Sequence, residues 1–150
     1  MTIYFASDHA GMSLRQILLS YLKVAGHDVM DLGPDDTTSV DYPDFGFKLA
    51  MALKQDNAGR GIAICGSGIG ISIALNRFPW VRAALVCQPE MAKLARQHND
   101  ANVLALGERL IAAETAIDSV QKFLLTEFEG GRHQRRVDKL SKINGESAAN

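Results

Sequence analysis

The sequence is poor in the features that mark several classes of protein. Its 150 residues carry 16 basic and 17 acidic side chains, a formal net charge of -1. This balance gives no reason to expect nucleic acid or an anionic membrane as the main partner. No apolar run approaches the roughly 18 residues that span a bilayer. The opening stretch MTIYFASDHAG is too short in apolar residues for a signal peptide and carries Asp8, so we expect a cytoplasmic protein.

Cysteine is also scarce, and the sequence has no residue pattern typical of metal ligands. The only two cysteines, Cys65 and Cys87, each close a short apolar run, which indicates reduced thiols rather than a disulfide framework. His9 and His98 lie far apart in the sequence, and no paired histidine and carboxylate spacing typical of zinc or non-haem iron occurs. We therefore expect no required metal ion.

What the chain does have is an alternation of short apolar runs with amphipathic ones. The patterns predict strands at 2–7, 27–33, 61–65, 81–86 and 102–107, and helices at 12–26, 44–56, 71–78, 89–98, 112–128 and 132–143. Nearly continuous apolar strands separated by helices are typical of a parallel sheet covered on both faces. We expect a single Rossmann-like three-layer α/β/α domain over residues 1–150. It would contain a five-stranded parallel sheet, an extra C-terminal helix and a frayed tail from residue 144.

A glycine-rich turn follows the third predicted strand, in the stretch GIAICGSGIGISIALNRF (61–78). A dinucleotide fingerprint needs G-x-G-x-x-G after the first strand, whereas Ile71 occupies the place of its last glycine. A nucleotide P-loop needs a lysine that this stretch lacks. Two interpretations remain: a cradle of backbone N–H groups for an anion at a helix N-terminus, or a tight turn that only packs helix on strand.

Cys65 stands at the start of this turn. A helix N-terminus favours the thiolate form of cysteine, and a thiolate beside an oxyanion cradle can act as a general base. The alternative is a small buried hydrophobic residue. A redox role is disfavoured because there is no C-x-x-C motif, so that a resolving thiol would have to be Cys87.

Three further polar clusters follow predicted strands or helices. SDHAG (7–11) offers Asp8 and His9, although Asp8 also suits a helix N-cap. ARQHNDANVLALGER (95–109) contains His98 and Asn99 between a predicted helix and a predicted strand, although turn chemistry alone could explain the asparagine. GGRHQRRV (130–137) puts two arginines at i and i+4, which suits either a phosphate or a solvated basic face. The two glycines before them would let the last helix leave its own domain and reach a neighbour.

Together with DYPDF (41–45) and CGSGIGISIALNR (65–77), these stretches resemble the type B ribose-5-phosphate isomerase family over residues 3 to about 140. That family also contains galactose-6-phosphate isomerase subunits and allose-6-phosphate isomerases. The resemblance implies cofactor-free aldose–ketose isomerisation of a phosphosugar through a cis-enediolate. It also implies homodimers or dimers of dimers, with active sites shared between subunits and the C-terminal helix packed on a partner.

The resemblance assigns three catalytic residues. Cys65 matches the base that moves a proton between C1 and C2, because the glutamate that some members use instead is replaced in this chain by Ile71. Ser67 takes a place often filled by threonine and would relay a proton between O1 and O2. His98 matches the acid that opens the furanose ring.

The remaining matches are substrate-binding residues. The backbone N–H groups of Gly66, Gly68 and Gly70 would form the oxyanion cradle, Asp8 and Asn99 would bind hydroxyl groups, Tyr42 would line the sugar, and His9, Arg132 and Arg136 would clamp the phosphate, with Arg109 as a further phosphate ligand that the partner chain could donate.

The expected reaction is the interconversion of ribose 5-phosphate and ribulose 5-phosphate. One alternative is a six-carbon phosphosugar, galactose 6-phosphate or allose 6-phosphate. Another is a non-catalytic phosphosugar-binding module of the same fold. Such a module needs only the phosphate clamp, so the presence of Cys65, Ser67 and His98 argues against it.

Overall fold

The computed structural model describes residues 1–143 and 146–147. Five strands form one sheet in the order β2-β1-β3-β5-β4, with every neighbouring pair parallel. Their bounds are β1 (Ile3–Ser7), β2 (Val29–Asp31), β3 (Arg60–Cys65), β4 (Ala83–Leu85) and β5 (Val103–Gly107). The predicted five-stranded parallel sheet is confirmed.

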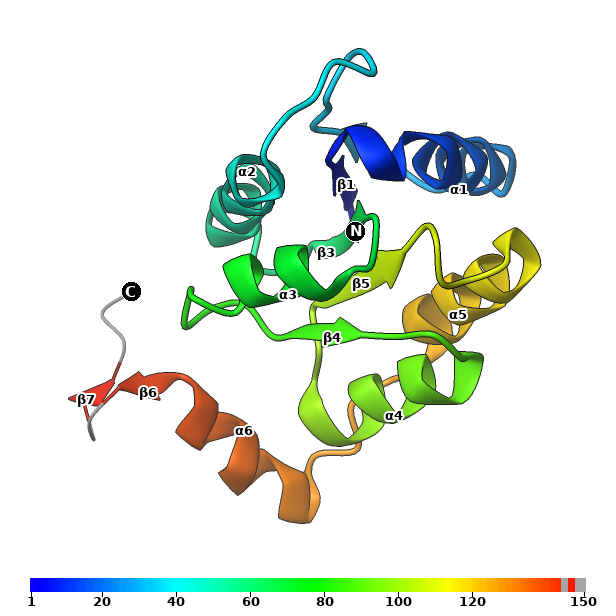
Figure 1. Cartoon of the computed structure of the whole chain (residues 1–150). Helices are drawn as coiled ribbons and strands as arrows, with labels where there is room; N and C mark the ends of the chain where they lie inside the picture. The colour runs from blue at the N-terminus through cyan, green and yellow to red at the C-terminus, as the bar shows by residue number, and fades with distance from the viewer. Residues whose placement is uncertain (144–145, 148–150) are drawn as a thin grey trace.

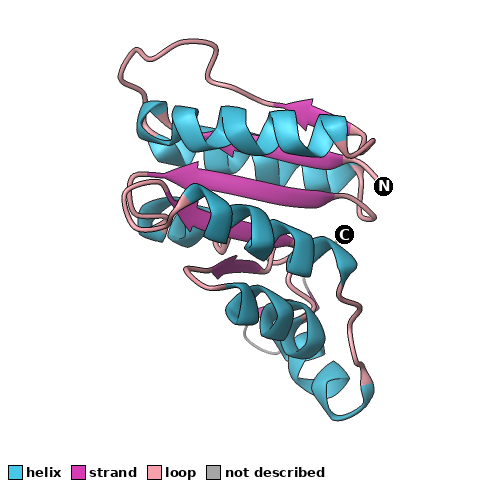
Figure 2. Cartoon of the chain, turned by 90° about the vertical axis from the view of Figure 1, so that its right-hand side faces the viewer, coloured by secondary structure: helices cyan, strands magenta, loops and turns pink. Residues whose placement is uncertain are grey.

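Helices cover both faces of this sheet, which gives three layers (Figures 1 and 2). They are α1 (Met12–Val24), α2 (Tyr42–Gln55), α3 (Ile69–Leu75), α4 (Pro89–Asn99), α5 (Ala113–Leu125) and α6 (Gln134–Leu140), with 3-10 turns η1 (His9–Gly11) and η2 (Gly131–His133). Helices α1, α4 and α5 pack on one face, and α2 and α3 pack on the other. No helix in the described part of the chain is long and apolar enough to cross a bilayer.

The alternation of side chains along β1 shows why the sheet is buried on both faces. Ile3 and Phe5 pack into the core beneath α1, α4 and α5, whereas Tyr4 and Ala6 pack into the core beneath α2 and α3. Successive side chains of a strand point to opposite faces, so a strand between two helical layers is apolar throughout. This is why the runs read as continuous in the sequence.

The topology creates a crevice at the carboxyl ends of β1 and β3. These strands are neighbours, but α1 after β1 and α3 after β3 lie on opposite faces of the sheet. Ligands of open α/β sheets bind at such a switch point. The stretches SDHAG and CGSGIG both begin there, one at the end of each strand.

The C-terminus differs from the prediction. The last helix, predicted to reach residue 143, ends at Leu140, and β6 (Lys142–Ile143) pairs antiparallel with β7 (Glu146–Ser147). The apolar spacing of Val137, Leu140 and Ile143 favoured a longer helix, whereas the intervening dipeptide Asn-Gly is a sequence signal for a hairpin. The rest of the predicted tail, residues 144–145 and 148–150, lies outside the described residues.

Candidate active site

A cavity of about 290 Å³ opens at the switch point. It is lined by Asp8, Tyr42, Cys65, Gly66, Ser67, Gly70, Arg109 and Leu110. All of these except Leu110 are predicted site residues. The structure therefore gathers Asp8, Tyr42, Arg109 and much of the glycine turn around one hollow.

Cys65 is the last residue of β3 and is 4% exposed. Its side chain packs with the core beneath α2 and α3, yet it also lines the cavity. The Gly68 N–H donates to Cys65 Sγ at 3.1 Å, with Gly68 at φ 76°, a left-handed conformation that favours glycine. This N–H is a ready donor to a negatively charged sulfur.

The backbone amides of the turn divide into two sets. Those of Gly68 and Ile69 are engaged, because the first donates to Cys65 Sγ and the second to Ser67 Oγ at 3.2 Å. Those of Gly66 and Gly70 border the cavity and hydrogen-bond to no other residue in the described part of the chain. The oxyanion cradle therefore has fewer free N–H groups than predicted, because the Gly68 N–H donates to Cys65 Sγ.

Ser67 is half-buried and lines the cavity, so its hydroxyl can reach a ligand there. Its Oγ accepts the Ile69 N–H, so the hydroxyl proton remains available for donation into the cavity. This arrangement suits a proton relay.

Asp8 combines two roles that the sequence left as alternatives. Its Oδ1 accepts the N–H groups of Ala10 at 3.0 Å and Gly11 at 3.2 Å, which caps η1. Its Oδ2 has no hydrogen bond to another described residue, and the side chain lines the cavity. Capping thus fixes the carboxylate and leaves one oxygen for a sugar hydroxyl.

Tyr42, at the start of α2, closes the cavity from the side of Gly70. A Cβ atom on Gly70 would lie 2.6 Å from Tyr42 Cζ, so the ring packs directly on the glycine backbone. Tyr42 is 40% exposed and can therefore contact a ligand in the cavity that it lines.

Two cationic or hydrogen-donating side chains stand near the same edge. The Arg109 guanidinium lies beside Gly66, where an added Cβ would be 3.0 Å from Nη1. Arg109 thus already lines the cavity of its own chain, and donation by a partner is not needed to explain its place. His9 Nδ1 accepts the Val40 N–H at 3.2 Å, so the neutral ring carries its proton on Nε2 and can donate from there.

The structure does not bring His98, Asn99, Arg132 and Arg136 to this cavity. Strand β5 begins at Val103 and ends at Gly107, which pairs with Cys65. Four residue steps along the strand span roughly 13 Å. His98 lies in the last turn of α4, before this strand begins, so it lies at the opposite edge of the sheet from Cys65.

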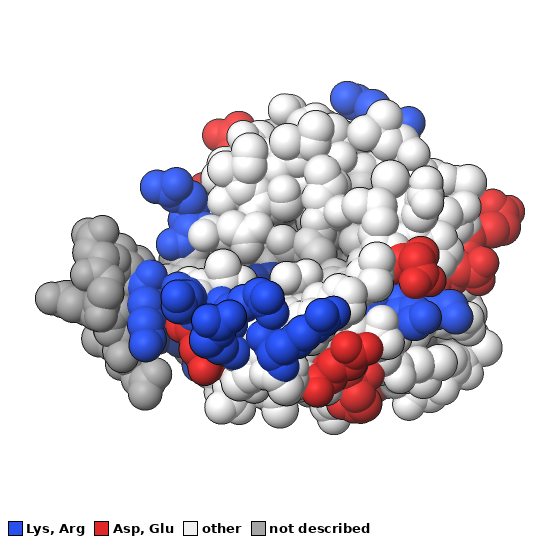
Figure 3. Space-filling view, turned by 90° about the horizontal axis from the view of Figure 1, so that it is seen from below, with Lys and Arg blue, Asp and Glu red and all other residues white. Residues whose placement is uncertain are grey.

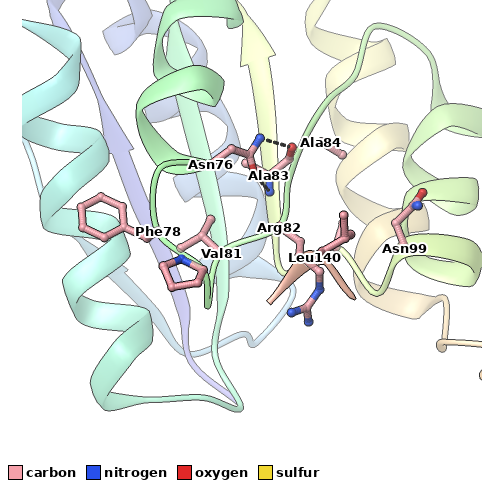
Figure 4. Close-up of a pocket in the computed structure, with 10 residues that line it drawn as sticks. Asn76, Phe78, Val81, Arg82, Ala83, Ala84, Asn99 and Leu140 are labelled. Carbon is pink, nitrogen blue, oxygen red and sulfur yellow. Dashed lines mark hydrogen bonds between the residues drawn. The ribbon is translucent and has the colours of Figure 1, made fainter. Parts of the chain in front are cut away.

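Asn99 lines a separate cavity of about 470 Å³ at that opposite edge (Figure 4). Asn76, Arg82 and Leu140 are among its other lining residues, so it lies between the end of α3, β4 and α6. Arg132 and Arg136 are both exposed, and Figure 3 shows a band of basic residues across the face of the molecule seen from below. Arg136 Nη1 donates to the Arg132 carbonyl oxygen at 2.8 Å, which keeps the two on one side.

Asp100 fixes the turn that follows His98. Its backbone is left-handed, at φ 46°, and ends α4. Its carboxylate accepts from Arg82 Nη2 and Arg96 Nη1, both at 2.8 Å. These charge-assisted bonds hold His98 and Asn99 in place at the surface.

His133 is a neighbour of His98 that sequence reasoning missed. The two rings stack with centroids 4.4 Å apart and planes at 12°. Burial, followed by the nearby charges of His98 and Arg132, lowers the pKa of His133 from its ordinary value. No spacing in the sequence links these two histidines, because the chain returns to α4 only after passing through α5.

Comparison with known proteins shows which family the chain resembles. The family model described as Ribose/Galactose Isomerase matches residues 3–140. Ribose-5-phosphate isomerase B of Escherichia coli is 41% identical over 141 residues, covering 94% of this chain and 95% of its own.

Solved structures are similarly close. Ribose-5-phosphate isomerase B of Clostridium thermocellum superposes with a TM-score of 0.91 at 49% identity, covering 93% of this chain and 95% of that one. The Mycoplasma genitalium enzyme with bound ribulose-5-phosphate has a TM-score of 0.89 at 45% identity and 93% coverage of both chains. With a family match across nearly its whole length, the chain belongs to the ribose/galactose isomerase family.

Proposed function

We propose that this protein is a cofactor-independent aldose–ketose isomerase that interconverts ribose 5-phosphate and ribulose 5-phosphate, with Cys65 as its base. The observation that carries this proposal is the position of Cys65 Sγ, which lines the cavity and accepts the Gly68 N–H at 3.1 Å. Gly66 and Gly70, whose N–H groups hydrogen-bond to no other described residue, line the same cavity. A base beside donors for a developing oxyanion is what removal of a carbon-bound proton requires.

The steps follow from these groups. On the open-chain aldose, the Cys65 thiolate takes the proton from C2, and the electron pair forms the C1–C2 double bond of an enediolate with its charge on O1. The Gly66 and Gly70 amides donate to this oxygen. Ser67 relays the hydroxyl proton from O2 to O1, and Cys65 then returns its proton to C1, which yields the ketose.

We propose that ring opening and part of phosphate binding come from a second copy of the chain. His98 lies at the opposite edge of the sheet from Cys65, so the two cannot meet within one chain. In a homodimer, or a dimer of dimers, the partner's His98 would open the ring and its Asn99 would bind a hydroxyl. The partner's Arg132 and Arg136 would then join His9 and Arg109 around the phosphate.

In such a dimer the C-terminal helix would contact the partner subunit. One chain would form a single isomerase domain over residues 1–150, with the segment after Gly130 packed on the partner. Glycine at 130 and 131, both at positive φ, supports such a departure from the domain. Because its substrate carries a charged phosphate, we place the enzyme in the cytoplasm.

The pentose phosphate is favoured over a six-carbon sugar by the relatives. Those at 41% and 49% identity are named ribose-5-phosphate isomerase B, and the Mycoplasma genitalium structure holds ribulose-5-phosphate. Galactose 6-phosphate and allose 6-phosphate remain the alternatives to be tested.

The test is ketose formation from ribose 5-phosphate, galactose 6-phosphate and allose 6-phosphate in the presence of a chelator. We expect the highest kcat/KM for ribose 5-phosphate, with Cys87→Ser as an active control because that exposed thiol lies outside the cavity. A higher kcat/KM for either hexose phosphate would overturn the substrate. Phosphosugar binding without any turnover would identify a binding module instead.

A further inference from the structure

We propose that His98, Glu129 and His133 form a binding site for a divalent transition-metal ion of the zinc class, and that the bound ion inhibits the enzyme. Each residue offers one ligand atom, and these three atoms all lie within 4.8 Å of one another. Two imidazole nitrogens and one carboxylate oxygen are a donor set that zinc uses when its fourth position stays open.

The backbone brings these residues together. The Glu129 N–H donates to the Gln97 carbonyl oxygen at 3.1 Å, which holds the segment after α5 against the last turn of α4. Gly130 and Gly131 have φ values of 63° and 52°, so the chain reverses there. The His133 N–H then donates to the Gly130 carbonyl oxygen at 2.9 Å, and the imidazole comes to lie against His98.

His133 supplies an independent observation that points to a ligand. It is 9% exposed, and its Nε2 is buried with no hydrogen-bond partner among the described residues. The Glu129 carboxylate is the facing acceptor, but its oxygen is 3.6 Å from Nε2, too far for a hydrogen bond. Buried polar atoms are almost always satisfied, so a cation between these groups would complete the cluster.

Side-chain rotation is enough to bring the three ligand atoms to metal-binding distances. With metal–ligand distances of about 2.0–2.2 Å, tetrahedral ligand atoms lie about 3.3 Å apart, roughly 1.5 Å closer than the present limit. The Glu129 side chain is 48% exposed and free to swing inward. The His98 ring, which is half-buried, would tilt out of its stack on His133.

Metal binding would take the lone pair of a His98 ring nitrogen. His98 could then no longer exchange a proton with the ring oxygen of the sugar, so turnover would stop until the ion left. The inhibition rests on the role proposed above for His98, whereas the binding does not.

The binding is tested by calorimetric titration of the full-length protein with zinc chloride. We expect one ion per chain and, for Glu129→Gln, an affinity weaker by at least about tenfold, the loss typical of removing even an outer partner of a metal site. Glu127→Gln removes an exposed carboxylate two residues away and should bind like the parent, as should Cys87→Ser. Thermal unfolding checks that Glu129→Gln folds, and His133→Gln serves as a second ligand variant.

Several outcomes would overturn the site: no binding, parental affinity in both ligand variants, or loss of binding in Cys87→Ser. A separate turnover assay tests inhibition. Zinc should inhibit the parent reversibly, and Glu129→Gln should keep parental basal activity while resisting zinc. Zinc bound at this site without inhibition would overturn the inhibitory role and count against His98 as the ring-opening acid.

Discussion

A site divided between two chains predicts that two inactive variants should restore activity to each other. Cys65→Ala removes the proposed base, and His98→Gln removes the proposed ring-opening acid. Loss of a positioned acid or base costs about 10²–10⁴-fold, so each variant alone should retain at most about 1% of parental turnover. Because Cys65 and His98 lie at opposite edges of the sheet, a mixed dimer would contain one intact site and one doubly damaged site.

The size of the rescue follows from random pairing. In an equal mixture, half of the dimers are mixed and half of the sites in each are intact, so activity should reach about one quarter of the parental value. The two variants would be co-expressed with different affinity tags, or unfolded and refolded together, and assayed with ribose 5-phosphate. A mixture of Cys65→Ala with the double variant Cys65→Ala/His98→Gln contains no intact site and serves as the control.

If both residues act within one chain, mixing should yield only the average of the two residual activities. That result, with mixed dimers verified through their tags, would refute the shared site.

Three smaller predictions test the phosphate clamp, the sugar pocket and the buried histidine. Arg136→Ala should raise KM about tenfold or more with little change in kcat, because the variant loses one charge-assisted hydrogen bond to the phosphate. The control Arg135→Ala should leave KM unchanged. An unchanged KM for Arg136→Ala in steady-state kinetics would remove Arg136 from the clamp. Gly70→Ala would place a Cβ 2.6 Å from Tyr42 Cζ and push the ring into the cavity, so kcat/KM should fall by up to about 100-fold; parental kinetics would contradict this contact. Burial lowers the pKa of His133 from 6.5, so below pH 6.5 the unfolded state binds more protons than the folded one. The free energy of unfolding in urea should therefore fall as the pH drops from 6.5 toward the lowered pKa, and this slope should be weaker in His133→Gln.

The sequence predicted the three central strands well because burial on both faces leaves an unambiguous apolar pattern. β1 is apolar at consecutive positions, and each such run is followed by an amphipathic helix. The end of α6 was mispredicted for the opposite reason. Val137 and Leu140 have helical spacing, and this pattern outweighed the Asn-Gly hairpin signal that lies between the paired segments Lys142–Ile143 and Glu146–Ser147.

The candidate site was predicted only as a set of residues. The motifs place Cys65, Ser67 and Asp8 near one another, as the structure does, because Cys65 ends β3 and Asp8 follows β1 at the same edge of the sheet. The sequence could not show that the Gly68 N–H donates to Cys65 Sγ, because this hydrogen bond depends on the backbone conformation of Gly68. Nor could it show that His98 meets His133, since that contact depends on how the chain returns after α5.

The most direct measurement of the central claim follows the carbon-bound hydrogen itself. Ribose 5-phosphate carrying deuterium at C2 would be incubated with the parent and with Cys65→Ala, and departure of the label from C2 would be followed by NMR. We expect the parent to remove the deuterium and Cys65→Ala to do so at least about 100-fold more slowly, while both bind the phosphosugar and unfold at similar temperatures. Removal of the label by Cys65→Ala at the parental rate would mean that another group takes the proton, and the sulfur would not be the base.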